Sequence, residues 1–443
     1  MTIELSGHYG YGRLIKATLP MALMMIIVSV YSIVDGYFIS NWAGSDAFAG
    51  MNLIWPPIAV VGAIGLMVGT GGSALVSKTF GEGHPEEARR IFTMMIRLTV
   101  IAGVILGTIC FILMPWLAKV LGADEAMMPH AILYGRILII VLPAYMLQMA
   151  FQPFFMVAER PHFGTALSIF SGVTNIILDA LFVAVFSWGL TGAALASCAG
   201  ILLNAGIPIW FFSSKRNKTQ LSFVPTRLDW KKILKSCSNG ISEFVGSIAL
   251  SVVSMCYNWQ LMRYIGANGV SAYGIIMYLG FIFAAIFIGY NMGVSQIIAY
   301  NYGAGNKPEL RSLLKKSLVI IGLVGVVITA LAELSADVIA DIFVGYDAEL
   351  RDLTAYATRV YMLSFLICGF NMFCSAWFTS LNNGIISAIG AFVRTLVFEF
   401  ACVFILPMLF GIEGIWVAVN VAELLSLFLT ISLIIGFRKR YGY

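Results

Sequence analysis

The chain has 443 residues, of which 60% are hydrophobic and only 11% carry a charge, with a mean hydropathy of +0.91 and a net charge of +5. A soluble domain carries roughly 25% charged residues, so this chain has too few charges to cover a water-facing surface. The composition argues against a soluble enzyme and gives no reason to expect a nucleic-acid partner. It predicts an all-α integral membrane protein.

Apolar stretches long enough to cross a membrane recur along the whole chain. A hydrocarbon core takes about 20 apolar residues per helix, and we predict about twelve such helices, six in each half. The first six are expected at 14–40, 50–77, 90–114, 130–157, 163–186 and 189–213, and the second six at 232–264, 271–300, 310–332, 354–380, 386–409 and 413–437.

A polar stretch with no apolar run separates these two sets of helices. It contains Pro225 and several basic residues, and no other stretch is a plausible boundary. We therefore predict an N-terminal six-helix lobe (1–218), a cytoplasmic connector (219–231) and a C-terminal six-helix lobe (232–443).

The second half of the chain repeats the first at a constant spacing of about half the chain. An even number of helices per half makes such a repeat parallel, and transporters built from repeats bind their substrate between them. The matching positions include Gly71, Ser73, Gly81, Gly83, Glu87 and Arg89, which recur as Gly293, Ser295, Gly303, Gly305, Glu309 and Arg311.

Basic residues fall on one side of the membrane if the helices alternate in direction. They precede the first helix, flank the second and eighth loops, fill the connector and close the chain. The opposite side holds mainly acids, among them Asp124, Glu125, Asp337 and Asp341. The positive-inside rule predicts that both termini are cytoplasmic.

Two acids lie inside predicted helices of the first half. A carboxylate at a helix centre costs about 2.5–3.5 kcal/mol on insertion scales, and such groups usually mark ion or substrate pathways. Asp35 lies in the first helix and Asp179 in the fifth, with Asn175 one turn earlier on the same face. Two neighbouring carboxylates favour a bound proton or a shared cation. The alternative is that they only accept hydrogen bonds from other helices.

The second half lacks these acids and carries a different set of charges. The positions that correspond to Asp35 and Asp179 in the repeat are Tyr257 and Ala401, which favours a functional role for the acids rather than a structural one. In the second half we expect Arg394 to form an ion pair with Glu399 or Glu423. This pair has either a structural role or a role in transport. Glu243 has no partner that the sequence identifies. The charged residues that we expect inside the membrane helices of the second half are Glu243, Arg394, Glu399 and Glu423.

Some methionines and aromatic residues are candidates to line a substrate cavity, although packing is the commoner role of such side chains. Methionine surfaces adapt to varied ligands and aromatic faces attract organic cations. The sequence shows no nucleotide-binding loop and no catalytic arrangement, so we predict that the chain is not an enzyme and needs no cofactor beyond a coupling ion. The candidate lining residues are Tyr145, Met149, Phe154 and Tyr257.

Four segments give the chain a resemblance to the multidrug and toxic compound extrusion (MATE) transporters over nearly its whole length. They are GLMVGTGGSALVSKTFGEGHPEEAR from Gly65, NIILDALF with GLTGAALA from Asn175, YNYGAGN from Tyr300, and GIEGIWVAVNVAELLS from Gly411. The third resembles the branch that contains staphylococcal-type drug exporters.

The resemblance implies two six-helix bundles around a central cavity that exports organic cations in exchange for H⁺ or Na⁺. It implies a coupling-ion site at Asp35, Asn175, Asp179 and Ser197, where Na⁺ would be the only metal. The family's acid on the seventh helix falls at Glu243, which is either a cavity acid or a residue that extends to the membrane interface. One departure is Gln296, which stands where many relatives have proline.

We therefore expect a multi-pass antiporter of the bacterial inner (plasma) membrane, acting as a monomer on small cationic or amphipathic substrates. A flippase for lipid-linked precursors is the alternative within the same broad fold superfamily. A passive channel or a receptor is a rival of another class. The sequence leaves open the substrate, the choice between H⁺ and Na⁺, and the resting conformation.

Overall fold

The computed structural model describes residues 4–42 and 45–443, and almost all of this part of the chain is helical. The first half forms α1 (Tyr11–Trp42), α2 (Ser45–Gly81), α3 (Pro85–Val120), α4 (Met127–Ile140), α5 (Leu142–Val157), α6 (Pro161–Asp179), η1 (Ala180–Val185) and α7 (Gly189–Ser213). The second half forms α8 (Trp230–Tyr264), α9 (Ala267–Gly303), α10 (Lys307–Val344), α11 (Ala348–Met362), α12 (Phe365–Ser380), α13 (Gly384–Phe392), η2 (Val393–Glu399), α14 (Phe400–Phe410) and α15 (Ile412–Tyr441).

Within the described residues, ten helices are long and apolar enough to cross a membrane, and two bent pairs raise the number to as many as twelve. This agrees with the predicted twelve. The expected helix 130–157 is bent by 59° between α4 and α5, where Pro143 lies in the first turn of α5. Proline lacks an N–H and its ring displaces the carbonyl four residues earlier, which accounts for the bend. The matching bend of 45° between α11 and α12 contains no proline, and no residue there predicts it.

The fifth helix of each half contains a π-helical turn: η1 ends the helix of the first half, and η2 lies between α13 and α14 in the second. Asp179 ends α6 immediately before η1, and Glu399 is the last residue of η2. A π-helical turn widens the helix and shifts the side chains that follow, and such turns are frequent at functional sites. Each half therefore places an acid at the edge of an irregular helical turn.

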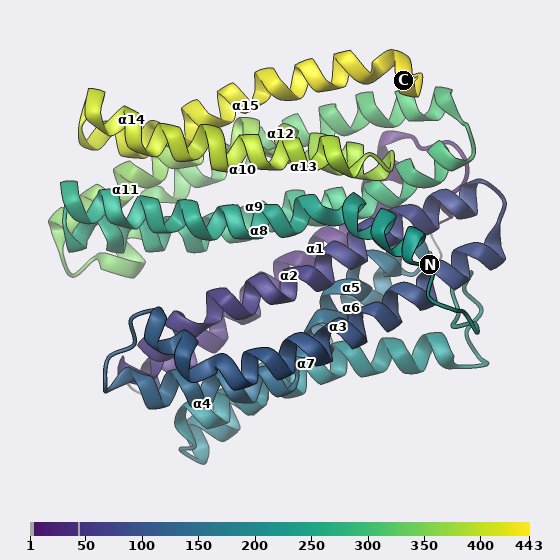
Figure 1. Ribbon diagram of the computed structural model, residues 1–443. Coiled ribbons are helices and arrows are strands. Elements are labelled where there is room, and N and C mark those ends of the chain that lie inside the picture. The colour runs from purple at the N-terminus through teal and green to yellow at the C-terminus, as the bar shows by residue number, and fades with distance from the viewer. Residues whose placement is uncertain (1–3, 43–44) are drawn as a thin grey trace.

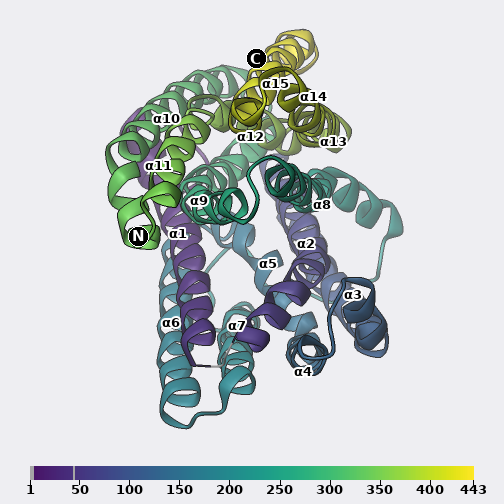
Figure 2. The same cartoon turned by 90° about the vertical axis from the view of Figure 1, so that its left-hand side faces the viewer.

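The two halves pack as separate lobes that meet at the end of the molecule where both termini lie, here called the terminal end (Figure 1). There α1 and α2 of the first lobe pack on α8 and α9 of the second. Away from the terminal end, α1 and α2 diverge from α8 and α9, as the view along the helices shows (Figure 2).

Glycines allow the helices at the terminal end to touch backbone to backbone. A Cβ on Gly81 would collide with the carbonyl of Tyr300, and one on Gly303 would collide with the carbonyl of Lys78. These two contacts are related by the internal repeat. A Cβ on Gly240 would likewise collide with the Met67 carbonyl. Small residues permit this approach, which gains dispersion contacts where the hydrophobic effect does not drive helices together.

Gln296 occupies the centre of this contact. Its side chain accepts a hydrogen bond from Ser77 (2.9 Å) and donates one to Ser73 (3.0 Å). The departure from proline thus has a structural role in this chain, because a proline could make neither bond across the lobes.

The repeated glutamates tie each lobe to the other at the terminal end. Glu87 pairs with Lys232 at the start of α8 (2.7 Å). Its repeat partner, Glu309, accepts a hydrogen bond from the Tyr9 N–H (2.9 Å) and lies 2.7 Å from Nδ1 of His8, just before α1. A glutamate at the start of α3 thus holds the start of α8, and the corresponding glutamate at the start of α10 holds the start of α1.

The repeated arginines hold the chain segments that leave each lobe. Arg89 donates from Nε to the carbonyl of Gln220 (2.9 Å), and Arg311 donates from Nε to the carbonyl of Gly442 (3.2 Å). The two donors correspond in the repeat, and so do the two acceptors. The Glu-x-Arg motif found in both halves therefore makes corresponding hydrogen bonds at the terminal end.

Replacing Gly240 with alanine is expected to weaken the contact between α2 and α8. The added methyl group has no room because the Met67 carbonyl occupies its position. Gly246 on the same helix is the matched control, since a Cβ there meets nothing within 4 Å. We expect Gly240→Ala to lower the thermal unfolding midpoint of the purified protein. Gly246→Ala should leave it unchanged or raise it, because alanine favours a helix by about 1 kcal/mol. Equal midpoints for the two variants would contradict the packing described here.

Candidate functional site

Three elements bring the first-lobe polar residues together. α1 carries Asp35, the end of α6 carries Asn175 and Asp179, and α7 carries Ser197. α1 packs on α6, α7 and η1, which places these residues between the helices of one lobe. Asp179 is fully buried and Asn175 nearly so. The four predicted coupling-ion residues thus converge on one region, although their role in ion binding stays a prediction.

Most of the carboxyl and amide oxygens of this cluster lack hydrogen-bond donors. Asp35 and Asp179 lie within hydrogen-bonding reach of each other, and Ser197 lies within reach of Asp35. Among the described residues, no donor reaches either carboxyl oxygen of Asp179, Oδ1 of Asp35 or Oδ1 of Asn175. Buried polar groups without partners cost free energy and call for an explanation. A proton shared by the acids, or a cation held between them, would satisfy these oxygens.

Further polar side chains near the acids escaped the sequence reasoning. Tyr31 lies near Asp35, and its hydroxyl is 3.5 Å from Nε2 of Gln148. Gln148 and Gln152 on α5 are both buried, and Oε1 of each has no donor in the described part of the chain. The sequence could have revealed these residues, because two glutamines one turn apart stand out in an apolar helix. Buried amide groups normally need hydrogen-bond partners, so such a pair indicates a polar region inside the protein.

In the second lobe, Arg394 pairs with Glu423 rather than with Glu399. Oε1 of Glu423 accepts from Nη2 (2.5 Å) and Nε (2.9 Å) of Arg394, and Oε2 accepts from Nδ2 of Asn371 (2.6 Å). Thr430 in turn donates to Oδ1 of Asn371 (2.8 Å). Both carboxylate oxygens of Glu423 therefore accept hydrogen bonds, and no ion pair within 4 Å is found for Glu399 in the described chain.

The predicted cavity residues fall into two groups. Tyr145 and Met149 on α5 are half-buried, whereas Phe154 and Tyr257 are fully buried. Phe154 packs edge-on against Phe92 (4.9 Å between centroids), and Tyr257 stacks on Tyr273 (4.9 Å). In this conformation Phe154 and Tyr257 therefore belong to the core and do not line an open cavity.

Glu243 on α8 is half-buried, and no side-chain hydrogen bond or ion pair is found for it in the described residues.

From the sequence we identified one arginine inside the membrane helices, Arg394, and missed a second one, Arg136. Arg136 lies in the second half of α4, and its guanidinium stands over the ring of Phe111 (5.1 Å). Its Nε is buried and lacks an acceptor among the described side chains.

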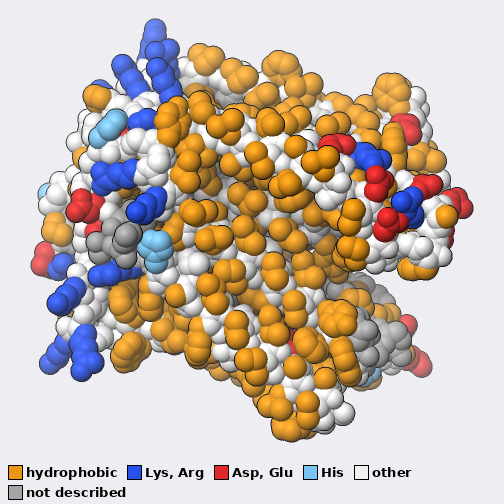
Figure 3. Space-filling model, turned by 180° about the vertical axis from the view of Figure 1, so that it is seen from behind, with side chains coloured by type: hydrophobic (Ala, Val, Ile, Leu, Met, Phe, Trp, Pro, Cys, Tyr) orange, Lys and Arg blue, Asp and Glu red, His pale blue; other side chains and the backbone are white. Residues whose placement is uncertain are grey.

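Charged side chains gather at the two ends of the molecule and leave an apolar belt between them (Figure 3). Lys and Arg crowd one end and Asp and Glu are concentrated at the other. At the acidic end, Arg359 pairs with Asp337 (2.5 Å) and Arg351 pairs with Asp341. This distribution is that of a protein embedded in a bilayer with its two ends in different compartments.

The fold and its buried acids define a multi-pass membrane protein made of two repeated lobes. The MatE family model matches residues 20–181 and again 244–405, one match in each half. The chain therefore belongs to the MatE family of transporters. Membership in this family confirms that it is a membrane transport protein and not an enzyme.

Relatives and solved structures agree with this assignment. The chain is 25% identical over 428 residues to the multidrug export protein MepA of Staphylococcus haemolyticus, a match that covers 96% of this chain and 93% of the relative. It superimposes with a TM-score of 0.91, at 20% identity, on a crystal structure of MATE in complex with MaL6, covering 99% of this chain and 97% of that one. The same values hold for a multidrug resistance MATE family transporter of the MOP superfamily in an outward-facing conformation.

Removing one member of the Arg394–Glu423 pair is expected to destabilise the second lobe. Breaking a buried pair costs about 3–5 kcal/mol, and because a quarter of the Arg394 side chain is exposed we expect about 2 kcal/mol for Glu423→Gln. Asp337→Asn, which breaks an exposed pair, is the control and should leave the thermal midpoint nearly unchanged. The combined Arg394→Met and Glu423→Gln variant should recover part of the loss. Equal midpoints for Glu423→Gln and Asp337→Asn would refute the assigned role.

Proposed function

We propose that the protein exports organic cations in exchange for H⁺ or Na⁺ by alternating access. The observation that carries this proposal is the pair of first-lobe acids, Asp35 and Asp179, of whose four carboxyl oxygens three are buried and lack donors in the described structure. A bound proton or Na⁺ supplies the missing partner. The Na⁺ ligands would be the carboxylates together with Asn175 and Ser197. The name of the staphylococcal relative, a multidrug export protein, supports drugs as the class of substrate.

The basic terminal end is assigned to the cytoplasm by the positive-inside rule. The helices of the two lobes touch at that end and diverge away from it (Figures 1 and 2), which supports an outward-facing conformation. In this state the coupling ion would enter from outside and reach the first-lobe acids. The connector between the lobes, 219–231, then runs along the cytoplasmic face.

α1 is the element that joins the acids to the closed end. Its outer half carries Asp35, and its inner half packs on α9, where Gly289 meets Ala22 and Gly293 meets Thr18. Pro20 lies in the interior of the helix and accepts a hydrogen bond at its carbonyl from Thr165 (2.6 Å). Because proline removes one helical hydrogen bond, α1 is weakest near that position and can bend there.

The coupling follows from this geometry. Loading the acids with a cation removes their mutual repulsion and draws the outer half of α1 toward α6 and α7. That movement pulls on the α1–α9 contact at the closed end. Ion and substrate need not touch, because a conformational equilibrium that both ligands bias is sufficient.

A substrate would contact residues that face the space between the lobes. Glu243 on α8 offers an acid without a partner in the described residues, and Tyr145 and Met149 on α5 offer adaptable apolar surface. The unpaired deep residues are mainly acids, while Arg394 is neutralised by Glu423. This balance favours cationic substrates over the anionic headgroups that a lipid-precursor flippase would carry.

Replacing Asp35 with asparagine is expected to abolish export, because the site loses its titratable carboxylate and half of its cation-binding charge. The measurement is ethidium efflux from cells that lack their own exporters. The control is Glu349→Gln, which neutralises an exposed acid at the end of the molecule opposite the terminal end, here called the far end. Wild type and control should export, and their efflux should stop when either the proton gradient or sodium is removed, which identifies the coupling ion. Efflux by Asp35→Asn at the wild-type rate would rule out the proposed coupling site.

A further inference from the structure

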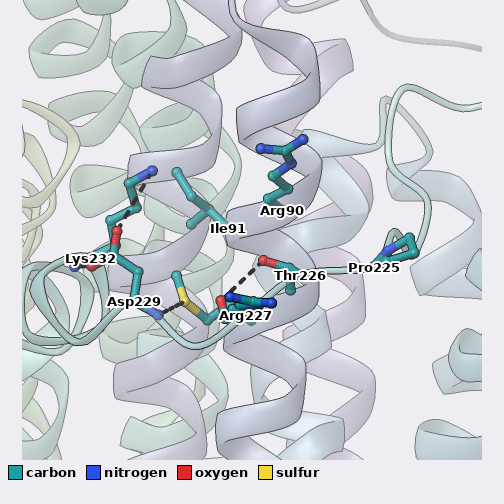
Figure 4. A pocket seen from close by; sticks show the side chains of 8 residues that line it. Arg90, Ile91, Pro225, Thr226, Arg227, Asp229 and Lys232 are labelled. Carbon is teal, nitrogen blue, oxygen red and sulfur yellow. Dashed lines mark hydrogen bonds and ion pairs between the residues drawn. The ribbon is translucent and has the colours of Figure 1, made fainter.

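A cavity of about 520 Å³ lies at the terminal end, beside the start of α3. It plays no part in the transport mechanism proposed above. Its walls come from the start of α3, the connector and the first turn of α8. The lining residues are Arg90, Ile91, Met94, Pro225, Thr226, Arg227, Asp229 and Lys232 (Figure 4).

The connector forms one wall of this cavity because α3 holds it in place at several points. Phe223 stacks on Phe92 of α3 (5.2 Å), and the Val224 N–H donates to Oγ1 of Thr93 (3.1 Å). One turn further along α3, Arg97 donates to the carbonyl of Thr226 (2.7 Å). The connector therefore follows the surface of α3 toward the membrane before α8 begins.

The lining carries an excess of positive charge. Glu87, an acid close to Arg90, is already paired with Lys232, and the carboxylate of Asp229 caps α8 by accepting from two backbone N–H groups. The guanidinium groups of Arg90 and Arg227 form no hydrogen bond or ion pair within residues 4–42 and 45–443, and both side chains are exposed. Two guanidiniums from different elements thus border one cavity with their donors available (Figure 4).

The cavity lies at the depth of lipid headgroups. On α3, the exposed apolar residues that face the hydrocarbon begin at Val100, three residues or about 4.5 Å beyond Arg97. On α8, Trp230 and Leu234 are about two-thirds exposed beside the cavity. Tryptophan is enriched at the level of the headgroups, and the apolar residues beyond it would meet the acyl chains.

We propose that this cavity binds the headgroup of an anionic phospholipid of the cytoplasmic leaflet. Arginine recognises phosphate oxygens through paired N–H donors, and basic pockets between membrane helices on the cytoplasmic side bind such headgroups. Arg90 and Arg227 bind the phosphate, while the acyl chains follow the apolar face of α3. Because the cavity is shared by α3 of the first lobe and α8 of the second, a bound lipid holds the two lobes together at the closed end.

The test measures lipid binding rather than transport. Purified protein in a neutral detergent is titrated with phosphatidylglycerol or phosphatidylcholine, and binding is followed by native mass spectrometry and by the thermal unfolding midpoint. We expect wild type to bind phosphatidylglycerol more strongly than phosphatidylcholine. The Arg90→Gln and Arg227→Gln double variant should lose about 30-fold in phosphatidylglycerol affinity, as expected for two basic groups near a membrane surface.

The control is a double variant of equal charge, Arg216→Gln with Lys218→Gln, which alters residues just before the connector and outside the cavity. It should bind phosphatidylglycerol as wild type does. Equal affinity in wild type and in the Arg90/Arg227 variant would overturn the proposal. Inorganic phosphate or glycerol phosphate that raises the midpoint as much as the lipid would assign the cavity to a soluble anion and would also overturn it.

Discussion

Close backbone contact between glycine-bearing helices is the constraint on which the rest of the structure depends. In a bilayer the hydrophobic effect does not hold helices together, so two lobes can be joined only through close packing and polar contacts. Gly81 and Gly303 provide such packing through equivalent contacts on each other's helix, and Gln296 adds hydrogen bonds across the lobes. All of these contacts lie at one end. In the proposed mechanism the lobes separate at that end while the helices within each lobe stay packed together, as alternating access requires.

In the proposed mechanism, ion binding at the buried acids makes this contact open and close. Asp35 and Asp179 lie within one lobe, yet Asp35 is on α1, and the same helix contacts α9 at the closed end. A change in charge at the acids therefore acts on a helix that also forms part of the closed end. The second lobe is built differently. Its Arg394 and Glu423 pair with each other, and the remaining acids, Glu243 and Glu399, do not form a close acid pair like that of the first lobe. The asymmetry between the lobes follows from these two arrangements and not from a difference in fold.

The sequence was sufficient for the number of helices, the repeat and the family, because each depends on patterns that extend over long segments. Apolar length determined the helices, and the recurrence of glycine, glutamate and arginine at a constant spacing revealed the repeat. Local irregularities were harder to predict. Pro143 accounts for the bend between α4 and α5, but no residue accounts for the bend before α12 or for the π-helical turns beside Asp179 and Glu399. Burial was also hard to predict, because a phenylalanine such as Phe154 has the same apolar character in a core as in a cavity.

The most direct test of this account is a pair of distances measured by electron spin resonance in lipid nanodiscs. One pair of labels, at Glu125 and Tyr346, reports on the far end, and the other, at His84 and Arg440, reports on the terminal end; all four positions are exposed. When the coupling ion is varied, we predict that wild type shortens one distance while lengthening the other, and that Asp35→Asn shows neither change. Distances that change in the same direction, or that respond to the ion equally in the variant, would contradict the account.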